Sequence, residues 1–454
     1  MTTPPTTTST DPTDPAHPTD PTASAGPSPD PGRTGATRPR EETDTSTIDG
    51  ILARAAELDA RDPLAALRDR FVPGDAEFVA YLDGNSLGRP LLATRERLAR
   101  FVDDVWAPRL IRGWDEGWMD SPTTLGDTLG RLTLGAAPGQ TVVADSTTVM
   151  LYKLARAAVT ARPGRTEIVI DSENFPTDRY VLEGIAAETG TRLVWIDPDP
   201  LAGVTAEQVA AVTGPDTALV VLSHVAFKSG YLADAPAITA IAHRHGALVL
   251  WDLCHSAGVV PVELDAWDVD LAVGCTYKYL NGGPGSPAFG YVAQRLQSEL
   301  RQPIQGWMGH AEPFTMGPGY TPGEGMRRFI SGTPPVVGML AMRDMLELIE
   351  EAGLDAVRTK SLALTAYVLE LAETLLTRHG VEVTGPREPE RRGGHVMLSH
   401  PAFRELVPRL WERGVIPDFR PPQGMRVGLS PLSTSFTEVA RALLVVAEML
   451  GARR

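Results

Sequence analysis

The sequence predicts an α/β protein with a large domain, built on a mostly parallel β-sheet covered by helices, and a smaller α+β domain after it. Between residues 140 and 279, short apolar runs rich in valine and isoleucine alternate with stretches of helical periodicity. These runs are apolar almost without interruption, which is typical of strands buried on both faces of a parallel sheet. From about residue 330 the pattern changes to short strands and amphipathic helices, which predicts a second, smaller domain.

Six apolar runs predict strands, because each has the length and the β-branched content of a buried strand. They cover residues 140–145, 166–171, 192–197, 217–225, 247–252 and 269–279. Helical periodicity predicts helices over 146–161, 178–189, 205–212 and 235–246. In the smaller domain we expect strands over 394–400 and 425–431 and helices over 401–413 and 435–450. Ligands of parallel sheets bind beyond the carboxyl ends of the strands, so the polar residues that follow these runs are candidates for a site.

The chain divides into four predicted parts. Residues 1–47 contain no Val, Ile, Leu, Phe, Trp or Tyr, so they cannot bury enough apolar surface to offset the entropy of folding. We expect them to form a disordered Pro/Thr-rich extension. Residues 48–135 are mainly helical and are expected to pack on both domains. The large domain is predicted over 136–325 and the small C-terminal domain over 326–454.

The composition argues against several classes of function. A net charge of −15 disfavours nucleic acid or an anionic membrane as a partner. The two cysteines, Cys254 and Cys275, exclude a disulfide framework and are typical of a reducing compartment. No run approaches the ~20 apolar residues of a membrane span, and no apolar signal core is present near the N-terminus. We therefore expect a soluble, cytoplasmic protein.

Lysine is rare in this chain. Only four of the 42 lysines and arginines are lysines, and Lys278 lies at the end of the last apolar run, in TYKYLNGGPG. Arginine is a permanent cation, whereas a desolvated lysine can lose its proton and become a nucleophile. Taken alone, the position of Lys278 fits compositional accident slightly better than a function. Lys153 and Lys360 lie in predicted helices and are expected on solvated faces. Lys228 is the one rival, but it has no upstream carboxylate at a spacing like that between Asp252 and Lys278.

Polar and aromatic side chains follow other predicted strands. Asp252 ends one run and has His255 just beyond it, and Ser223 lies near the end of another. Phe175 and Asp178 lie in the loop SENFPTDRY after a third run. Phe175 could stack on a flat ring or could be an ordinary core anchor. Because the carboxyl ends of parallel strands share one edge of the sheet, we expect these side chains to converge.

The helix predicted after residue 145 opens with Ser146, Thr147 and Thr148. Free N–H groups and hydroxyls at a helix N-terminus favour phosphate, although an ordinary N-cap uses the same residue types. Combined with the groups above, they describe a site for a planar, phosphorylated pyridine aldehyde. A lysine amine would form an imine with the aldehyde, and an aspartate would keep the ring nitrogen protonated. The sequence therefore predicts pyridoxal 5′-phosphate as the cofactor, joined to Lys278.

At these residues the sequence resembles the kynureninases, a family of fold-type-I, class-V aminotransferase-like enzymes that use pyridoxal phosphate. The motifs that carry the resemblance are YLDGNSLGRP, STTVMLYKL, NFPTDRY, DLCHSAG, CTYKYLNGGPGSPAF, GWMGH, FISGTPP and MRVGLSPLSTSF, between about residues 75 and 450. The resemblance implies a seven-stranded sheet and a homodimer with its active site at the subunit interface. It also implies hydrolysis of L-kynurenine, or of 3-hydroxykynurenine, to anthranilate or 3-hydroxyanthranilate and L-alanine. Such a reaction belongs to tryptophan breakdown by the kynurenine route toward NAD, or to a pathway that supplies anthranilate.

The resemblance also implies roles for individual residues. Lys278 is expected to be the Schiff-base lysine and proton shuttle, Tyr277 an acid, and Asp252 the partner of the pyridinium nitrogen. The implied cofactor-binding residues are Lys278, Thr147, Thr148, Phe175, Asp178, Ser223, Asp252, His255, Tyr277, Trp307 and Thr333. Trp307 and Thr333 are expected to act across the dimer interface. Arg426 is expected to clamp the substrate α-carboxylate, and Ser86 to contact the substrate. No metal is implied.

Other functions stay open at this point. Trp106, Trp114 and Trp118 could line an aryl pocket or serve as packing anchors. A cysteine desulfurase or selenocysteine lyase needs a cysteine late in the chain, and none follows Cys275. A transaminase is less firmly excluded. A binding module that kept the fold without the activity is the non-enzymatic alternative.

Overall fold

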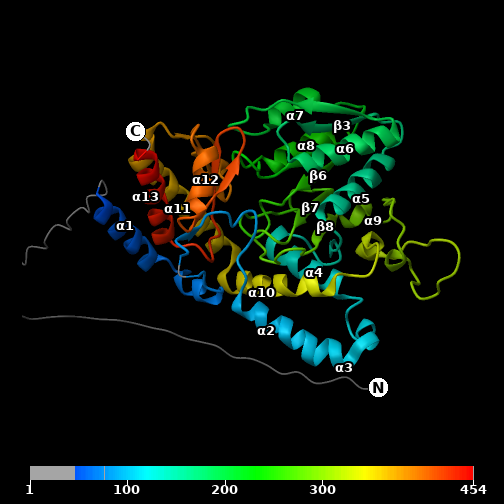
Figure 1. Cartoon of the computed structure of the whole chain (residues 1–454). Coiled ribbons are helices and arrows are strands. Elements are labelled where there is room, and N and C mark those ends of the chain that lie inside the picture. The colour runs from blue at the N-terminus through cyan, green and yellow to red at the C-terminus, as the bar shows by residue number, and fades with distance from the viewer. Residues whose placement is uncertain (1–46, 76, 453–454) are drawn as a thin grey trace, which may run out of the picture. The chain divides into compact units, whose positions relative to one another are not determined.

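The computed structural model describes residues 47–75 and 77–452, and a seven-stranded sheet forms its centre (Figure 1). The strand order is β2-β8-β7-β6-β5-β3-β4, and only β8 runs antiparallel to its neighbours. The strands are β2 (Thr141–Val143), β3 (Glu167–Asp171), β4 (Arg192–Ile196), β5 (Thr217–Ser223), β6 (Leu248–Asp252), β7 (Leu271–Cys275) and β8 (Ala288–Val292). The predicted α/β fold with a mostly parallel sheet is confirmed.

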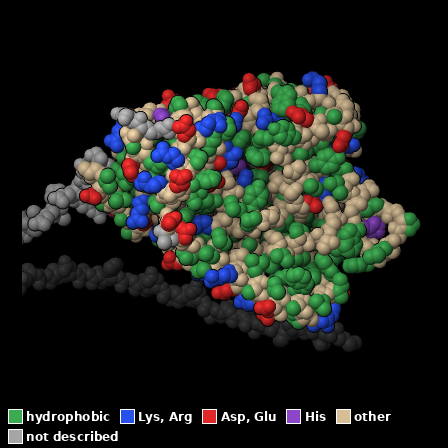
Figure 2. All heavy atoms as spheres, in the orientation of Figure 1, with side chains coloured by type: hydrophobic (Ala, Val, Ile, Leu, Met, Phe, Trp, Pro, Cys, Tyr) green, Lys and Arg blue, Asp and Glu red, His purple; other side chains and the backbone are tan. Residues whose placement is uncertain are grey.

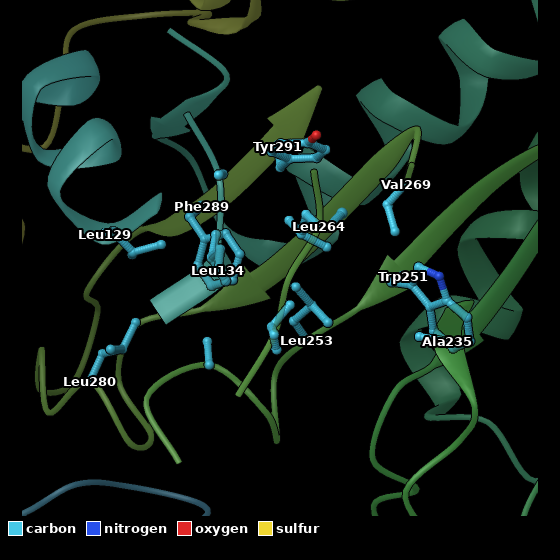
Figure 3. Packing of buried hydrophobic residues seen from close by; sticks show 14 of the residues in the cluster. Leu129, Leu134, Ala235, Trp251, Leu253, Leu264, Val269, Leu280, Phe289 and Tyr291 are labelled. Atoms are coloured by element: carbon cyan, nitrogen blue, oxygen red, sulfur yellow. The ribbon is translucent and has the colours of Figure 1, made fainter. Parts of the chain in front are cut away.

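Helices cover both faces of this sheet, as the apolar strands require. On one face lie α5 (Thr147–Thr160) and α6 (Pro176–Thr189), and on the other α4 (Ser121–Leu129), α8 (Ala235–Arg244) and α10 (Val336–Ala352). Helix α7 (Ala206–Val212) packs against α8. Along β5, Leu219 and Val221 belong to the hydrophobic cluster on the side of α5 and α6, whereas Val220 and Leu222 belong to the cluster on the side of α4, α8 and α10. Figure 3 shows residues of the latter cluster, with Phe289 next to Leu134 and Trp251 next to Ala235.

The six strands predicted in the large domain all form, although each is shorter than predicted. The helix predicted over 178–189 begins earlier, at Pro176, because proline is well suited to the first turn of a helix. Strand β8 has no counterpart among the predicted apolar runs. It is only five residues long and contains Gly290, so its pattern is too weak to stand out from the preceding Gly/Pro-rich turn.

A second sheet, of four antiparallel strands, follows the large one along the chain. Its order is β12-β13-β10-β9, with β9 (Glu382–Val383), β10 (His395–Ser399), β12 (Asp418–Arg420) and β13 (Gly424–Gly428). Around it pack α11 (Leu354–Leu371), α12 (Phe403–Trp411), α13 (Phe436–Gly451) and α1 (Ile48–Arg61). Helix α13 begins with a capping box in which Ser435 and Glu438 exchange side-chain to backbone hydrogen bonds.

The segment before β2 is mainly helical and reaches both sheets. Helix α1 packs against α13, α2 (Leu92–Arg100) against α10, and α4 against β2. Helix α2 continues through a π-helical turn into the short α3 (Ala107–Arg109), and α9 (Gln294–Gln297) follows β8. Strand β1 (Ala80–Tyr81) pairs in parallel with β11 (Val415–Ile416), which brings the loop YLDGNSLGRP beside β13. The three boundaries between the four predicted parts stay predictions, and the extension predicted over residues 1–47 lies outside the described residues except for Thr47, the N-cap of α1.

Within residues 47–75 and 77–452, no helix has both the length and the apolar character needed to cross a bilayer.

Candidate active site

Five strands deliver side chains to one edge of the large sheet. Because β2, β3, β5, β6 and β7 run in the same direction, their carboxyl ends meet there. The register places Ser223 opposite Asp252, and Asp252 opposite Val273 on the next strand. The turn that carries Lys278 leaves this edge directly after β7.

Lys278 is buried in this turn and contacts two of the predicted site residues. Its Nζ lies 3.3 Å from His255 Nε2 and 5.9 Å from the centre of the Phe175 ring. The neighbouring Tyr277 ring lies 6.0 Å from the same amine. Within the described chain, no carboxylate lies close enough to pair with Lys278, so the amine is not held in a salt bridge. It is therefore available for chemistry.

The turn is held in place by the loop YLDGNSLGRP. The Gly88 N–H donates to the Tyr277 carbonyl at 2.8 Å. A Cβ on Gly88 would lie 2.4 Å from the Lys278 carbonyl oxygen, so only glycine permits this approach. Asn281, with a positive φ of 49°, donates through its side chain to the Arg89 carbonyl at 2.7 Å. These contacts explain why a Gly/Asn-rich sequence follows Lys278.

Two carboxylates lie buried near this amine. Asp252 accepts the Cys254 N–H at 2.7 Å through Oδ1. Asp178 lies in the first turn of α6, and Lys278 lies near enough to act on it electrostatically. Burial, reinforced by the negative charges of Asp252 and Asp171, raises the pKa of Asp178 well above its usual value.

Phe175 and Ser223 are joined by residues that sequence analysis did not single out. Asn174 accepts both the Ser223 hydroxyl at 2.8 Å and the Phe175 N–H at 2.7 Å. The Phe175 ring packs edge to face on Phe227, with 5.3 Å between the ring centres. Because Phe175 also lies over Lys278, it faces the site and does not serve only as a core anchor.

The N-terminus of α5 lies at the same edge. Ser146 is its N-cap and accepts the Val149 N–H, as in an ordinary cap. The N–H groups of Thr147 and Thr148 precede the first full helical turn and have no intrahelical partner. The side chain of Thr148 is exposed and that of Thr147 is half-buried. Both the capping role and the capacity to bind an anion are therefore present.

Arg426 is almost fully buried between the two sheets. Its Nη1 donates to the Phe227 carbonyl at 2.9 Å, and its Nη2 lies 2.9 Å from Asp418 and also contacts Ser86. Asp83 lies 3.4 Å from the same nitrogen. Burial lowers the pKa of Arg426, yet arginine remains a cation at neutral pH. The structure thus brings the predicted pair Arg426 and Ser86 together, next to the phenylalanine that packs on Phe175.

Trp307 and Thr333 lie apart from the Lys278 cluster. Trp307 is 43% exposed and packs edge to face on Phe314, with 5.9 Å between the ring centres. The two predicted residues are near each other along the backbone, since the Met308 N–H donates to the Ser331 carbonyl at 3.3 Å. Within the described part of one chain, neither contacts the predicted cofactor-binding residues.

The other three lysines have structural partners. Lys153 and Lys360 are buried and paired with Asp145 and Asp62, so the prediction that both lie on solvated faces is wrong. A periodic pattern cannot reveal such pairing, because a long side chain can place its charge inside the core when a carboxylate meets it there. Lys228 pairs with Glu173 and is partly exposed.

The tryptophans before β2 pack mainly on one another. Trp114 and Trp118 lie edge to face with 5.3 Å between ring centres, and Trp118 also packs on Phe101 at 5.8 Å. Trp106 is half exposed. The first two therefore serve as packing anchors.

His395, on β10 of the small sheet, is a site residue that sequence analysis missed. Its ring centre lies 5.9 Å from that of His255, and it is buried. Burial lowers the pKa of both histidines well below the usual value, so both are neutral at pH 7. A lone histidine on a predicted strand carried no signal of this contact, because the contact joins the two sheets.

Several buried polar atoms around this edge lack a partner among the described residues. They are Asp178 Oδ2, Asn174 Nδ2 and both ring nitrogens of His395. Buried polar groups are nearly always hydrogen-bonded, so these atoms indicate that a polar ligand completes the site. A phosphorylated pyridine aldehyde offers a ring N–H when it is protonated, oxygens on the ring substituents and a phosphate. The residues present fit it.

The seven-stranded sheet, with a buried lysine and a buried aspartate on its carboxyl edge, defines the class: fold-type-I pyridoxal-phosphate enzymes. Solved structures of this class resemble it. An apo cysteine desulfurase from Thermococcus onnurineus NA1 has a TM-score of 0.71 at 18% identity, covering 87% of this chain and 98% of that one. The cystine C-S lyase C-DES, solved with cysteine persulfide, has a TM-score of 0.71 at 20% identity, covering 82% of this chain and 98% of that one.

Sequence comparison specifies the family. A family model named kynureninase C-terminal domain matches residues 357–446, and one for DegT/DnrJ/EryC1/StrS aminotransferases matches residues 139–261. The kynureninase of Pseudomonas fluorescens is 42% identical over 400 residues, which cover 87% of this chain and 94% of that protein. That of Burkholderia pseudomallei (strain 1106a) is 40% identical over the same shares of each chain. The chain belongs to the kynureninase family.

Proposed function

We propose that the protein catalyses the hydrolysis of L-kynurenine to anthranilate and L-alanine with pyridoxal 5′-phosphate, and that 3-hydroxykynurenine is an alternative substrate. The observation that carries the proposal is the position of Lys278. Its buried amine, 3.3 Å from His255 and 5.9 Å from the Phe175 ring, lies at the sheet edge that also holds Asp252. Family membership supports the reaction.

Each residue at this edge has a task that its geometry supports. Bound pyridoxal phosphate supplies a protonated ring that accepts electrons from the substrate α-carbon. Asp252 keeps the ring nitrogen protonated, because a nearby carboxylate raises the pKa of a pyridinium. Phe175 would cover the ring face, and Asp178, Ser223 and His255 would complete the shell around it.

Lys278 and Tyr277 handle protons. Lys278 Nζ is buried and free of salt bridges, so it can take the proton from the substrate α-carbon and return it later. Burial raises the pKa of Tyr277, so its hydroxyl stays protonated and can serve as an acid when the β–γ bond breaks. The N-terminus of α5, with Thr147 and Thr148, would hold the phosphate.

Arg426 binds the substrate α-carboxylate, with Ser86 beside it. Its planar fork can hold a carboxylate through two hydrogen bonds. Two acidic side chains, Asp83 and Asp418, orient the guanidinium, and Ser86 Oγ accepts a hydrogen bond from its Nη2. Because Arg426 is buried, the bound carboxylate is shielded from water, which strengthens the pairing.

The functional unit is a homodimer. Exposed hydrophobic side chains gather over α2, α3 and the turns beside them (Figure 2), at Leu98, Val102, Val105, Trp106, Leu110 and Ile111. Trp307, Phe314 and Met316 add a second exposed apolar group. Such surfaces are typical of protein–protein interfaces, and two-fold dimers are the commonest closed assembly. In such a dimer, Trp307 and Thr333 would help to hold the phosphate bound in the second subunit.

The protein acts in the cytoplasm, in tryptophan breakdown toward NAD or in a route that supplies anthranilate. Two free, buried thiols, Cys254 and Cys275, support a reducing compartment.

Product analysis tests the proposal. Purified protein should be yellow with bound pyridoxal phosphate and should convert L-kynurenine to anthranilate and alanine in equal amounts without a keto acid. Lys278→Ala should abolish both the colour of the lysine-bound cofactor and turnover. The matched control Lys228→Ala should keep both. A transaminase would need a keto acid and would give no alanine from kynurenine, and a binding module would give no product; either result would reject the proposal.

A further inference from the structure

Lys153 is fully buried in α5, two turns from the proposed phosphate-binding end of that helix. Its Nζ contacts the Asp145 carboxylate and donates to the Phe329 carbonyl at 2.6 Å. A buried lysine is costly unless it is paired, so a specific task must retain it in a chain that otherwise uses arginine.

Asp145 occupies an unusual place for an acidic residue. It immediately precedes Ser146, the N-cap of α5, and its φ of 53° lies in the left-handed region. A carboxylate at this end of the helix competes with any anion that binds there, because both are attracted to the same N–H groups. A second negative charge near a phosphate also repels it. Without compensation, Asp145 would weaken a phosphate site.

Lys153 supplies that compensation from inside the protein. The Lys153 side chain is fully buried, whereas that of Asp145 is 20% exposed, so the amine offsets the carboxylate charge from within the core. Asp145 Oδ2 also accepts the Ser331 hydroxyl at 3.5 Å. Ser331 in turn accepts the Met308 N–H, next to Trp307. The ion pair therefore also fixes the segments that carry Trp307 and Thr333.

We propose that Lys153 is a positioning residue that neutralises Asp145, so that the N-terminus of α5 can bind the cofactor phosphate. The inference rests on the proposed function, because it assumes that the phosphate lies at Thr147 and Thr148. It concerns a residue that contacts no substrate atom. Burial lowers the pKa of Lys153 while Asp145 opposes this shift, which is consistent with a tightly held pair.

A series of variants that remove these charges tests the inference. Each protein is stripped of cofactor and titrated with pyridoxal phosphate. In Lys153→Met the Asp145 carboxylate is uncompensated, and the dissociation constant should rise about tenfold to a hundredfold. In the double variant Lys153→Met/Asp145→Asn no charge remains, and affinity should return close to that of the wild type. Pyridoxal, which lacks the phosphate, should bind the single variant as it binds the wild type.

The pair of Lys360 and Asp62 is a matched control. It is also a buried pair, with 2.7 Å between Nζ and Oδ2, but it joins α11 to the end of α1. Lys360→Met should lower the melting temperature and leave the dissociation constant of pyridoxal phosphate unchanged.

Three results would overturn the inference: wild-type affinity in Lys153→Met, a double variant as weak as the single one, or equal weakening for pyridoxal. Each would mean that Lys153 acts through packing or not at all. The phosphate site is tested separately by Thr147→Val/Thr148→Val. If this variant binds pyridoxal phosphate more weakly than the wild type, the proposed phosphate site stands even when the inference about Lys153 fails. If the wild type binds no pyridoxal phosphate, the proposed function itself fails.

Discussion

At the scale of single residues, the four lysines of this chain divide by what surrounds each amine. Lys153, Lys228 and Lys360 each meet a carboxylate within ion-pair distance. Lys278 meets a neutral histidine and two aromatic rings instead. Ion pairs therefore hold the amines of those three lysines, whereas no ion pair among the described residues holds the Lys278 amine. This difference in surroundings separates Lys278 from the lysines that have structural partners.

Tyr277 and Tyr279 lie on either side of Lys278. Substituting each in turn tests the proposal that Tyr277 is the acid that donates a proton when the β–γ bond breaks. Tyr277→Phe should lower kcat by about 10²- to 10⁴-fold, because the proton donor for bond cleavage is lost while the ring remains. Stopped-flow and steady-state assays with L-kynurenine would measure this. The cofactor spectrum should change little.

Tyr279→Phe is the control for that prediction. The Tyr279 hydroxyl is buried and has no partner among the described residues, so its removal should leave kcat nearly unchanged. Comparable activity in Tyr277→Phe and the wild type would remove Tyr277 from the mechanism.

At the scale of elements, the position of the loop YLDGNSLGRP decides how the site is built. The loop bridges from Asp83 to Gly428 on β13, while Gly88 hydrogen-bonds Tyr277 in the turn after β7. It therefore joins the lysine turn to the strand that carries Arg426. Its glycines permit these close approaches, and a side chain at Gly88 would collide with the Lys278 carbonyl.

The surface over α2 and α3 predicts the oligomeric state. Val102→Glu/Ile111→Glu places two charges among apolar side chains that are 47% and 76% exposed, so it should convert a dimer into monomers. Activity should fall with dimerisation, because Trp307 and Thr333 would no longer reach the second subunit. Analytical ultracentrifugation and activity at the same protein concentration would measure both effects.

The control substitution is Ile48→Glu, at a residue 63% exposed at the start of α1. It places a glutamate at an exposed isoleucine outside this surface and should leave the dimer intact. A wild-type protein that sediments as a monomer would contradict the proposed interface.

At the scale of the whole molecule, buried histidines link stability to pH. Burial lowers the pKa of His224 from 6.5 to about 3, and its ring bonds Ser256 Oγ at 3.0 Å. The unfolded chain binds a proton at this residue below about pH 6.5, and the folded protein does not. The free energy of unfolding therefore falls as the pH drops, by about 2 kcal/mol between pH 7 and pH 5 for this residue.

His224→Gln should remove the fall in unfolding free energy that His224 causes at low pH. The difference in unfolding free energy between pH 7 and pH 5 should therefore shrink by about 2 kcal/mol relative to the wild type. Denaturant unfolding at both pH values would measure it, and the lost hydrogen bond adds an offset that is equal at both. Proton uptake by buried carboxyls such as Asp178 is common to both proteins and cancels in the comparison.

His243 is the control of opposite sign. Its hydrogen bond to Asp270 raises its pKa, so its stabilising effect is present below pH 6.5 and is lost as the pH rises through the raised pKa. His243→Gln should therefore destabilise the protein more at pH 5 than at pH 7. The same pH response in both variants would contradict the assignment of a buried, neutral His224.

The large sheet could be predicted because its strands carry local signals. Runs such as TALVVLS are apolar on both faces and need no partner to be recognised. Strand β8 could not be predicted from its five residues, because it is stabilised by pairing with β2 and β7 on either side. The turn of Lys278 and the end of β6 were also predictable, since a parallel sheet sends all its carboxyl ends to one edge.

The amino-acid sequence by itself determined the fold class, the family and the polar residues at the strand ends, because periodicity, turn residues and motifs are local properties of the chain. Only the tertiary structure decided the partners of those residues. It placed His395 beside His255, enclosed Arg426 between two carboxylates, and buried Lys153 against Asp145. Each of these contacts joins segments that packing brings together, and the charge and burial that control the chemistry arise only when those segments meet.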